Sequence, residues 1–164
     1  MRELDPEAAG DHIDALFRAA WAMSGSPQIA EDLVQETYVK VLSRPRLLRR
    51  DDDLGYLVKA LRNTWYSHLR KERVRREVTD PGSQPPEDLP ARNSRDDPQA
   101  SLEATEVLEA LAALPEPYRE TLAAVDVAGL SYAEAARALG VRQGTVMSRL
   151  HRGRDQLART LQPG

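Results

Sequence analysis

A proline-rich stretch in the middle of the chain restricts the fold more than any other feature. Five of the eleven prolines lie between residues 81 and 98. Proline fixes φ and carries no backbone N–H, so this polar, net negative stretch is predicted to be neither a helix nor a central strand. We interpret residues 80–99 as a flexible linker between two compact units, residues 1–79 and 100–164.

Both units are predicted to be helical. Only 5% of the residues are aromatic, so a core built from the 41% hydrophobic residues must consist mainly of Leu, Val and Ala, which favours helices. Apolar residues recur at helical spacing, and no strand pattern competes with them. The expected helices are residues 12–23, 29–42 and 53–76 in the first unit, and residues 102–114, 115–127, 131–139 and 144–161 in the second. The sequence therefore predicts an all-α fold of two small helical domains.

The apolar stripes also predict which side chains face inward. Ile13 is expected in the stripe of the first helix, Leu42 in that of the second and Leu161 in that of the last. Trp65 follows the spacing of the inner stripe of helix 53–76, so we assign it to the core rather than to a binding face.

Residues 131–154 carry the signs of a helix-turn-helix. Ser131 followed by Glu134 forms a capping box at the start of the first helix. Gly140 stands where the turn needs a left-handed residue, and Val146 and Leu150 provide an apolar wedge between the helices. This arrangement lets a second helix protrude into a major groove. The alternative is an ordinary helical hairpin whose small residues only pack.

The outer face of the second helix carries polar and basic side chains. Arginine pairs with guanine edges, and serine binds either a base or a phosphate. The candidate DNA contacts on this face are Thr145, Met147, Ser148, Arg149, His151 and Arg152.

The formal net charge is −3, but the charges are unevenly distributed. Residues 59–76 contain seven basic side chains and one acidic side chain, and residues 142–159 contain five arginines and one acidic side chain. Two basic stripes on an acidic chain are typical of a protein that holds a polyanion at two places. The alternative is a pair of solvated helix faces.

Two groups of motifs resemble one family. Residues 114–122 and 144–154 resemble region 4 of the bacterial extracytoplasmic-function (ECF) sigma factors. Residues 30–42, 56–63 and 68–71 independently resemble region 2 of that family. The motifs occur in the family's order, and the resemblance covers nearly the whole chain.

This resemblance implies roles for region 2. Helix 30–42 would dock on the coiled coil of the β′ subunit of core RNA polymerase through Asp32, Gln35 and Glu36. Helix 53–76 would melt and read the minus-ten promoter element, and loop 43–53 would capture a flipped-out base. The matching minus-ten residues outside the apolar stripe are Arg62, Asn63, Tyr66, Ser67, Arg70 and Arg73. Among them, the cations suit phosphates, and Tyr66 suits stacking on an exposed base.

For region 4, the resemblance implies that helix 144–161 reads the minus-thirty-five element and that helix 115–127 contacts the β flap. The linker would thread the polymerase channels, and an anti-sigma factor is an expected partner. Three residues depart from the family pattern. Ser67 replaces a usual Asp, Met147 replaces a common Lys or Arg, and Tyr56 replaces a frequent Trp.

The sequence contains no motif that indicates catalysis, metal binding or membrane insertion. His12, His68 and His151 are isolated, and there is no cysteine, so no catalytic group, metal site or cofactor is expected. No apolar run is long enough for membrane insertion, and a cytoplasmic protein is expected. The alternatives to a promoter-recognition subunit are a sigma-like decoy that binds an anti-sigma protein without DNA contact, and a stand-alone helix-turn-helix regulator.

Overall fold

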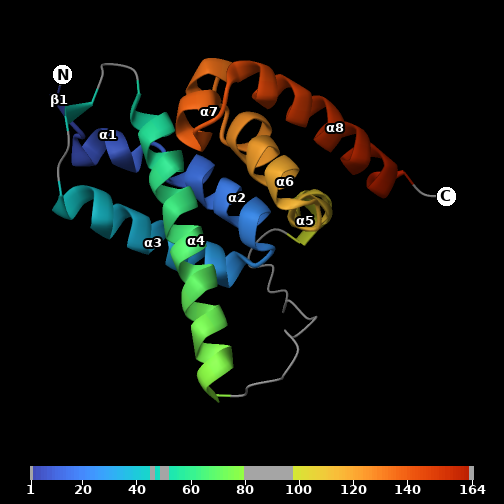
Figure 1. Cartoon of the computed structure of the whole chain (residues 1–164), viewed down its shortest axis with the longest axis horizontal. Coiled ribbons are helices and arrows are strands. Elements are labelled where there is room, and N and C mark those ends of the chain that lie inside the picture. The colour runs from blue at the N-terminus through green and yellow to red at the C-terminus, as the bar shows by residue number, and fades with distance from the viewer. Residues whose placement is uncertain (1, 45–46, 49–51, 80–97, 163–164) are drawn as a thin grey trace.

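The computed structural model describes residues 2–44, 47–48, 52–79 and 98–162, and helices make up most of them (Figure 1). The fold is all-α, as the sequence predicts. The stretch predicted to be a linker lies outside the described residues, except that a helix already begins at Pro98.

The N-terminal bundle contains one short and three longer helices. A tight turn joins the helix that ends at Ser24 to the helix that begins at Pro27. In this turn Gly25 adopts a φ of 76°. The Ser26 hydroxyl accepts a hydrogen bond from the Ile29 backbone N–H at 3.3 Å. The next helix begins at Pro27, whose missing N–H costs nothing in a first turn. The helices are α1 (Pro6–Gly10), α2 (Ile13–Ser24), α3 (Pro27–Ser43) and α4 (Asp53–Thr79).

The core of this bundle follows the predicted stripes, with two exceptions. Trp65 is buried, as predicted, and its ring stacks on His68 with centroids 5.6 Å apart. The predictions for Ile13 and Leu42 are wrong, because these side chains are 47% and 40% exposed. Both stand at helix ends, where the bundle no longer covers the whole apolar stripe.

A small strand pair contradicts the expectation that no strand competes with the helices. Strand β1 (Arg2–Glu3) pairs in antiparallel register with β2 (Leu47–Leu48). The Arg2 guanidinium also donates a 2.7 Å hydrogen bond to the Asp53 carboxylate at the start of α4. The pair fastens the N-terminus to the α3–α4 connection, and two-residue strands are too short to produce a visible alternation.

The C-terminal bundle follows the predicted order of elements, with one helix divided in two. Its α-helices are α5 (Pro98–Ala112), α6 (Glu116–Leu122), α7 (Tyr132–Leu139) and α8 (Gln143–Leu161). The single helix predicted over residues 115–127 is wrong in its second half, because residues Ala123–Val127 form a π-helical segment, η1. There the Ala128 N–H bonds to the Ala123 carbonyl, five residues back, at 2.9 Å. Gly129, at a φ of 87°, then ends the segment.

Helices α6 and α8 approach each other closely at Gly153. This glycine is buried, and a Cβ atom added to it would lie 2.5 Å from Leu122 Cδ1 and 3.1 Å from Tyr118 Cβ. The inner stripe of α8 otherwise contains the buried Val146 and Leu150, as predicted. The prediction for Leu161 is wrong, because this side chain is 41% exposed at the last position of the helix.

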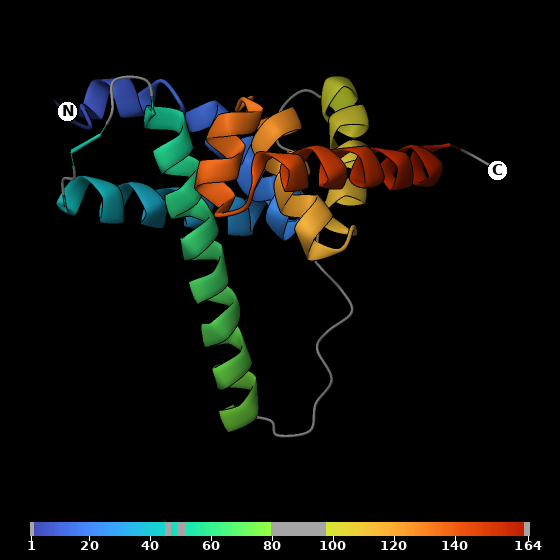
Figure 2. The ribbon, with the colours of Figure 1, turned by 45° about the horizontal axis from the view of Figure 1, so that its top comes forward.

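The two bundles pack against each other. Helix α2 contacts α5, α6 and η1, and α4 contacts α7. The second half of α4 is different, because it projects away from both bundles, as Figure 2 shows. Exposed Arg70, Lys71, Arg73 and Val74 lie on this projecting part.

Candidate nucleic-acid and polymerase interfaces

Local hydrogen bonds build the helix-turn-helix of α7 and α8. The Ser131 hydroxyl accepts from the Glu134 N–H at 3.1 Å, and the Glu134 carboxylate accepts from the Ser131 N–H at 2.9 Å. Gly140 ends α7 at a φ of 69°, a conformation that favours glycine. The predicted capping box and turn are confirmed, and they set the angle at which α8 leaves the bundle.

The structure divides the candidate residues of α8 between two surfaces. Thr145, Ser148, Arg149 and Arg152 line an open groove between α8 and the start of α6, whose side of the groove is formed by Pro115, Pro117 and Tyr118. Met147 and His151 line a separate hollow beside Tyr132 and Arg154. The four groove residues therefore form the continuous polar and basic face of the helix, and Met147 lies outside it.

Sequence reasoning missed the ion pair between Arg154 and Asp126. The Arg154 guanidinium donates two hydrogen bonds to the Asp126 carboxylate, at 2.7 and 3.0 Å. These hydrogen bonds raise the pKa of Arg154 above its usual value. The pair joins η1 to the middle of α8 and so helps to hold the orientation of α8 against the rest of the bundle.

Removing this pair is expected to have a small effect on stability. Asp126→Asn should lower the free energy of unfolding by about 0.5–1 kcal/mol, because both side chains remain partly exposed to solvent. Urea denaturation of the variant measures the change. The matched control is Asp155→Asn, which removes the more exposed pair with Arg159 and should cost less. Equal losses in the two variants would show that the Asp126 pair has no special positioning role.

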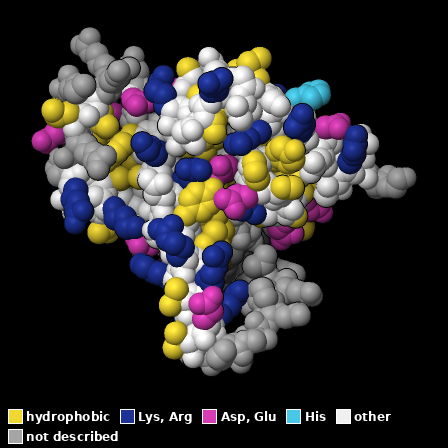
Figure 3. All heavy atoms as spheres, viewed as in Figure 1, with side chains coloured by type: hydrophobic (Ala, Val, Ile, Leu, Met, Phe, Trp, Pro, Cys, Tyr) yellow, Lys and Arg dark blue, Asp and Glu magenta, His cyan; other side chains and the backbone are white. Residues whose placement is uncertain are grey.

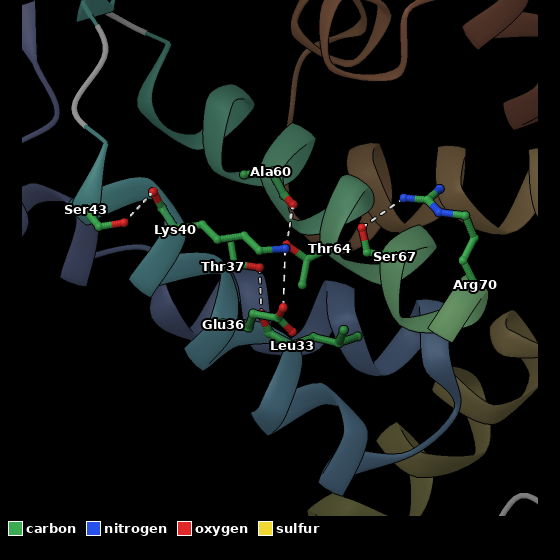
Figure 4. Close-up of polar contacts among 9 residues, drawn as sticks. All are labelled: Leu33, Glu36, Thr37, Lys40, Ser43, Ala60, Thr64, Ser67 and Arg70. Carbon is green, nitrogen blue, oxygen red and sulfur yellow. Dashed lines mark hydrogen bonds and ion pairs between the residues drawn. The ribbon is translucent and has the colours of Figure 1, made fainter. Parts of the chain in front are cut away.

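The candidate residues of α4 lie in three environments. Asn63 and Arg73 are exposed. Ser67 and Arg70 form a local pair, in which the Arg70 guanidinium donates to the Ser67 hydroxyl at 3.0 Å (Figure 4). Ser67 is one of the three residues that depart from the expected family pattern, in which Asp is usual. Its hydroxyl accepts this hydrogen bond from Arg70, one helical turn away.

Arg62 and Tyr66 lie where α4 faces the C-terminal bundle, and both bind Glu120 of α6. The Arg62 guanidinium donates to the two carboxylate oxygens at 3.0 and 3.4 Å. The Tyr66 hydroxyl donates to the same carboxylate. The guanidinium also lies 4.8 Å from the centre of the Tyr66 ring. One face of the ring is therefore covered by Arg62, so stacking of a base on that face requires Arg62 to move.

Burial, followed by hydrogen bonds to the carboxylates of α6, raises the pKa of Tyr66 above its usual value. The side chain of Glu120 is only 9% exposed. No signal in the sequence pointed to Glu120, because its partners lie more than fifty residues away along the chain.

The candidate polymerase-docking residues lie on the outer face of α3. Asp32 and Gln35 are exposed, and Glu36 forms a 3.3 Å ion pair with Lys40 (Figure 4). Val39 shares this face and is 67% exposed, which sequence reasoning missed. Asp32, Gln35 and Val39 therefore form one solvent-accessible face of α3 that mixes polar and apolar side chains.

Basic side chains gather over α4 and the adjoining part of the face seen in Figure 3, with fewer acidic ones among them.

Among the described residues, no group of three His, Cys, Asp or Glu side chains is arranged to hold a metal ion. Within the same residues, no helix has the length and apolarity needed to cross a membrane.

Comparison with known proteins accounts for both bundles. Residues 9–75 match the family model for sigma-70 region 2, and residues 104–157 match the model for sigma-70 region 4. The ECF RNA polymerase sigma factor EcfG of Rhodopseudomonas palustris is 35% identical over 150 residues, which cover 91% of this chain and 80% of EcfG. The chain belongs to the ECF RNA polymerase sigma factors. Proteins of this family direct transcription initiation from promoters, which agrees with the prediction from the sequence.

Other ECF sigma factors extend the match. SigL of Mycobacterium tuberculosis is 31% identical over 154 residues, covering 93% of this chain and 85% of SigL. SigE of Mycolicibacterium smegmatis is 35% identical over 158 residues, but the match covers 92% of this chain and only 59% of SigE.

Solved structures show the same arrangement of helices. The sigma factor RpoE of Bartonella quintana, in complex with the anti-sigma factor NepR, superimposes with a TM-score of 0.76 at 28% identity, and the match covers 94% of each chain. CnrH, in complex with the cytosolic domain of CnrY, shares the fold with a TM-score of 0.62 at 23% identity over 96% of this chain and 89% of CnrH.

Proposed function

We propose that this sigma factor docks on core RNA polymerase through α3 and contacts the promoter with α4 and α8. In this proposal, residues 1–79 read and melt the minus-ten element, and residues 100–164 read the minus-thirty-five element. The observation that carries the proposal is the presence of two separate basic helix faces, one in each bundle, together with acidic residues on α3. The protein would act in the cytoplasm, where promoter DNA and polymerase meet.

The test is run-off transcription with purified core polymerase on a panel of genomic promoter fragments. A product that depends on both this protein and a particular promoter is the expected result. If none of the promoters mapped by transcription-start sequencing after overproduction gives such a product, the proposal fails.

Two alternatives are less consistent with the exposed side chains. A decoy that only binds an anti-sigma protein has no need for cations on both helices, yet Arg70, Arg73 and Arg152 are exposed. A stand-alone regulator leaves the outer face of α3 without a role, and tight binding of duplex DNA by the free protein would identify it. The complex of Bartonella RpoE with NepR supports a further part of the proposal, that an anti-sigma protein binds this chain.

The docking face gives a direct prediction. Asp32→Ala combined with Glu36→Ala should weaken binding to core polymerase about tenfold, because two solvent-accessible charges at an interface contribute roughly 1 kcal/mol or less each. Fluorescence anisotropy of labelled protein with core polymerase measures this loss. The control is Glu103→Ala with Glu106→Ala, which removes two exposed charges from α5 instead. Equal core affinity in both double variants would place the docking face elsewhere.

A further inference from the structure

One buried carboxylate joins the two bundles. Glu120 of α6 accepts three hydrogen bonds from α4, two from Arg62 and one from Tyr66. A weaker ion pair joins the bundles at a second place, where the Arg137 guanidinium of α7 lies 3.7 Å from the Asp52 carboxylate just before α4. We call the first cluster, made of Arg62, Tyr66 and Glu120, the latch.

The donors of the latch are those that a nucleic-acid phosphate would use. A guanidinium fork and a hydroxyl bind a phosphate with the same geometry as a carboxylate. Both donors belong to the set proposed to contact the minus-ten strand. With Glu120 in place, Nε and Nη2 of Arg62 and the Tyr66 hydroxyl are hydrogen-bonded to α6, so a DNA strand can bind these atoms only after their contacts with Glu120 break.

A charged latch also differs from the rest of the interface. Isosteric apolar groups often stabilise a packed interface as well as a buried ion pair does, because an ion pair must first be desolvated. A cation such as Arg62, however, can exchange the carboxylate for another anion, such as a phosphate, when the bundles separate. Helix α5 and η1, which pack against α2, also contain buried apolar side chains such as Leu108 and Ala123, which have no such exchange partner.

We propose that Glu120 competes within the free chain against the phosphates of single-stranded promoter DNA for Arg62 and Tyr66, and so closes the minus-ten site until the bundles separate. This inference rests on the proposed function of α4. Because only the open form binds the strand, the apparent affinity of the free protein is reduced by the fraction of molecules that are open.

The first experiment uses Glu120→Gln, which keeps the size of the side chain and removes its charge. Binding of a fluorescent single-stranded oligonucleotide that carries the non-template minus-ten sequence should become roughly tenfold tighter in the full-length variant. The matched control is Glu109→Gln, which removes an exposed charge from α5 and should leave strand affinity unchanged. If Glu120→Gln binds the strand no more tightly than this control, the inference is overturned.

The second experiment leaves the three latch residues unchanged, so it does not depend on the folding of a latch variant. The chain has no cysteine, so Lys71→Cys and Ala158→Cys provide unique positions for a donor and an acceptor dye on the two bundles. Saturating strand should lower energy transfer, because binding and opening are thermodynamically linked. Strand binding with unchanged transfer would contradict the inference.

A third variant separates opening from DNA contact. Arg62→Ala in the dye-labelled chain should also lower energy transfer, but it should not tighten strand binding, because it removes a DNA-contacting cation together with the latch. If Arg62→Ala binds the strand as tightly as Glu120→Gln, Arg62 is not the shared group and the inference fails. Run-off transcription by the wild-type protein tests the proposed function independently of all three results.

Discussion

Gly153→Val is expected to destabilise the C-terminal bundle by about 3 kcal/mol, because it overpacks the contact between α6 and α8. A Cβ atom at this position would lie 2.5 Å from Leu122 Cδ1, well inside van der Waals contact. Leu122 is fully buried and has little room to move, and Tyr118 Cβ blocks a second direction. The helices would have to separate, and the apolar contacts beside Gly153 would loosen.

Urea denaturation followed by circular dichroism measures this loss, and Gly144→Ala is the matched control. Gly144 lies on the same helix, but a Cβ atom there would lie more than 4 Å from every described heavy atom outside its chain neighbours and its own helix backbone. Alanine at position 144 should be neutral or should stabilise the helix by up to about 1 kcal/mol. A Gly153→Val variant as stable as Gly144→Ala would show that the helices adjust freely at this contact.

Arg152→Ala is expected to weaken recognition of the minus-thirty-five element by about 1–3 kcal/mol if Arg152 reads a guanine. Arg152 is exposed and lines the groove together with Arg149, Ser148 and Thr145, so its guanidinium is available to a base edge. A bidentate contact to guanine cannot be replaced by water in a closely packed groove, so the loss should be greatest on promoters that carry that guanine.

The measurement is competition between promoters that differ at single minus-thirty-five positions, with holoenzyme reconstituted from each variant. The control is Arg159→Ala, on the same helix but outside the groove and paired with Asp155 at 2.9 Å. Arg159→Ala should change the affinity of the holoenzyme for promoter DNA little and should leave the order of preference among the promoters unchanged. An Arg152→Ala holoenzyme with an unchanged ranking would assign Arg152 to the phosphate backbone rather than to a base.

Predictions that depend on local sequence agree best with the structure. The capping box of Ser131 and Glu134, the left-handed Gly140 and the apolar wedge of Val146 and Leu150 all lie where the sequence places them. Such features depend on residues three or four positions apart, so the sequence contains both partners of each interaction.

The errors occur where an element ends or where a distant segment intervenes. Ile13, Leu42 and Leu161 follow the apolar period but lie at helix ends, where the described part of the chain leaves them 47%, 40% and 41% exposed. The change from α6 to the π-helical η1 also escaped prediction, because 3.6-residue periodicity does not distinguish one widened turn from a regular one.

The sequence by itself determined that this chain is an all-helical sigma factor with a helix-turn-helix, because helix periods, caps and family motifs are local properties of the chain. Only the tertiary structure decided that Gly153 must lack a side chain and that Glu120 occupies Arg62 and Tyr66. Those constraints join residues more than thirty positions apart for Gly153 and more than fifty apart for Glu120. Which distant side chains meet depends on how the helices pack, and no local pattern in the chain encodes that packing.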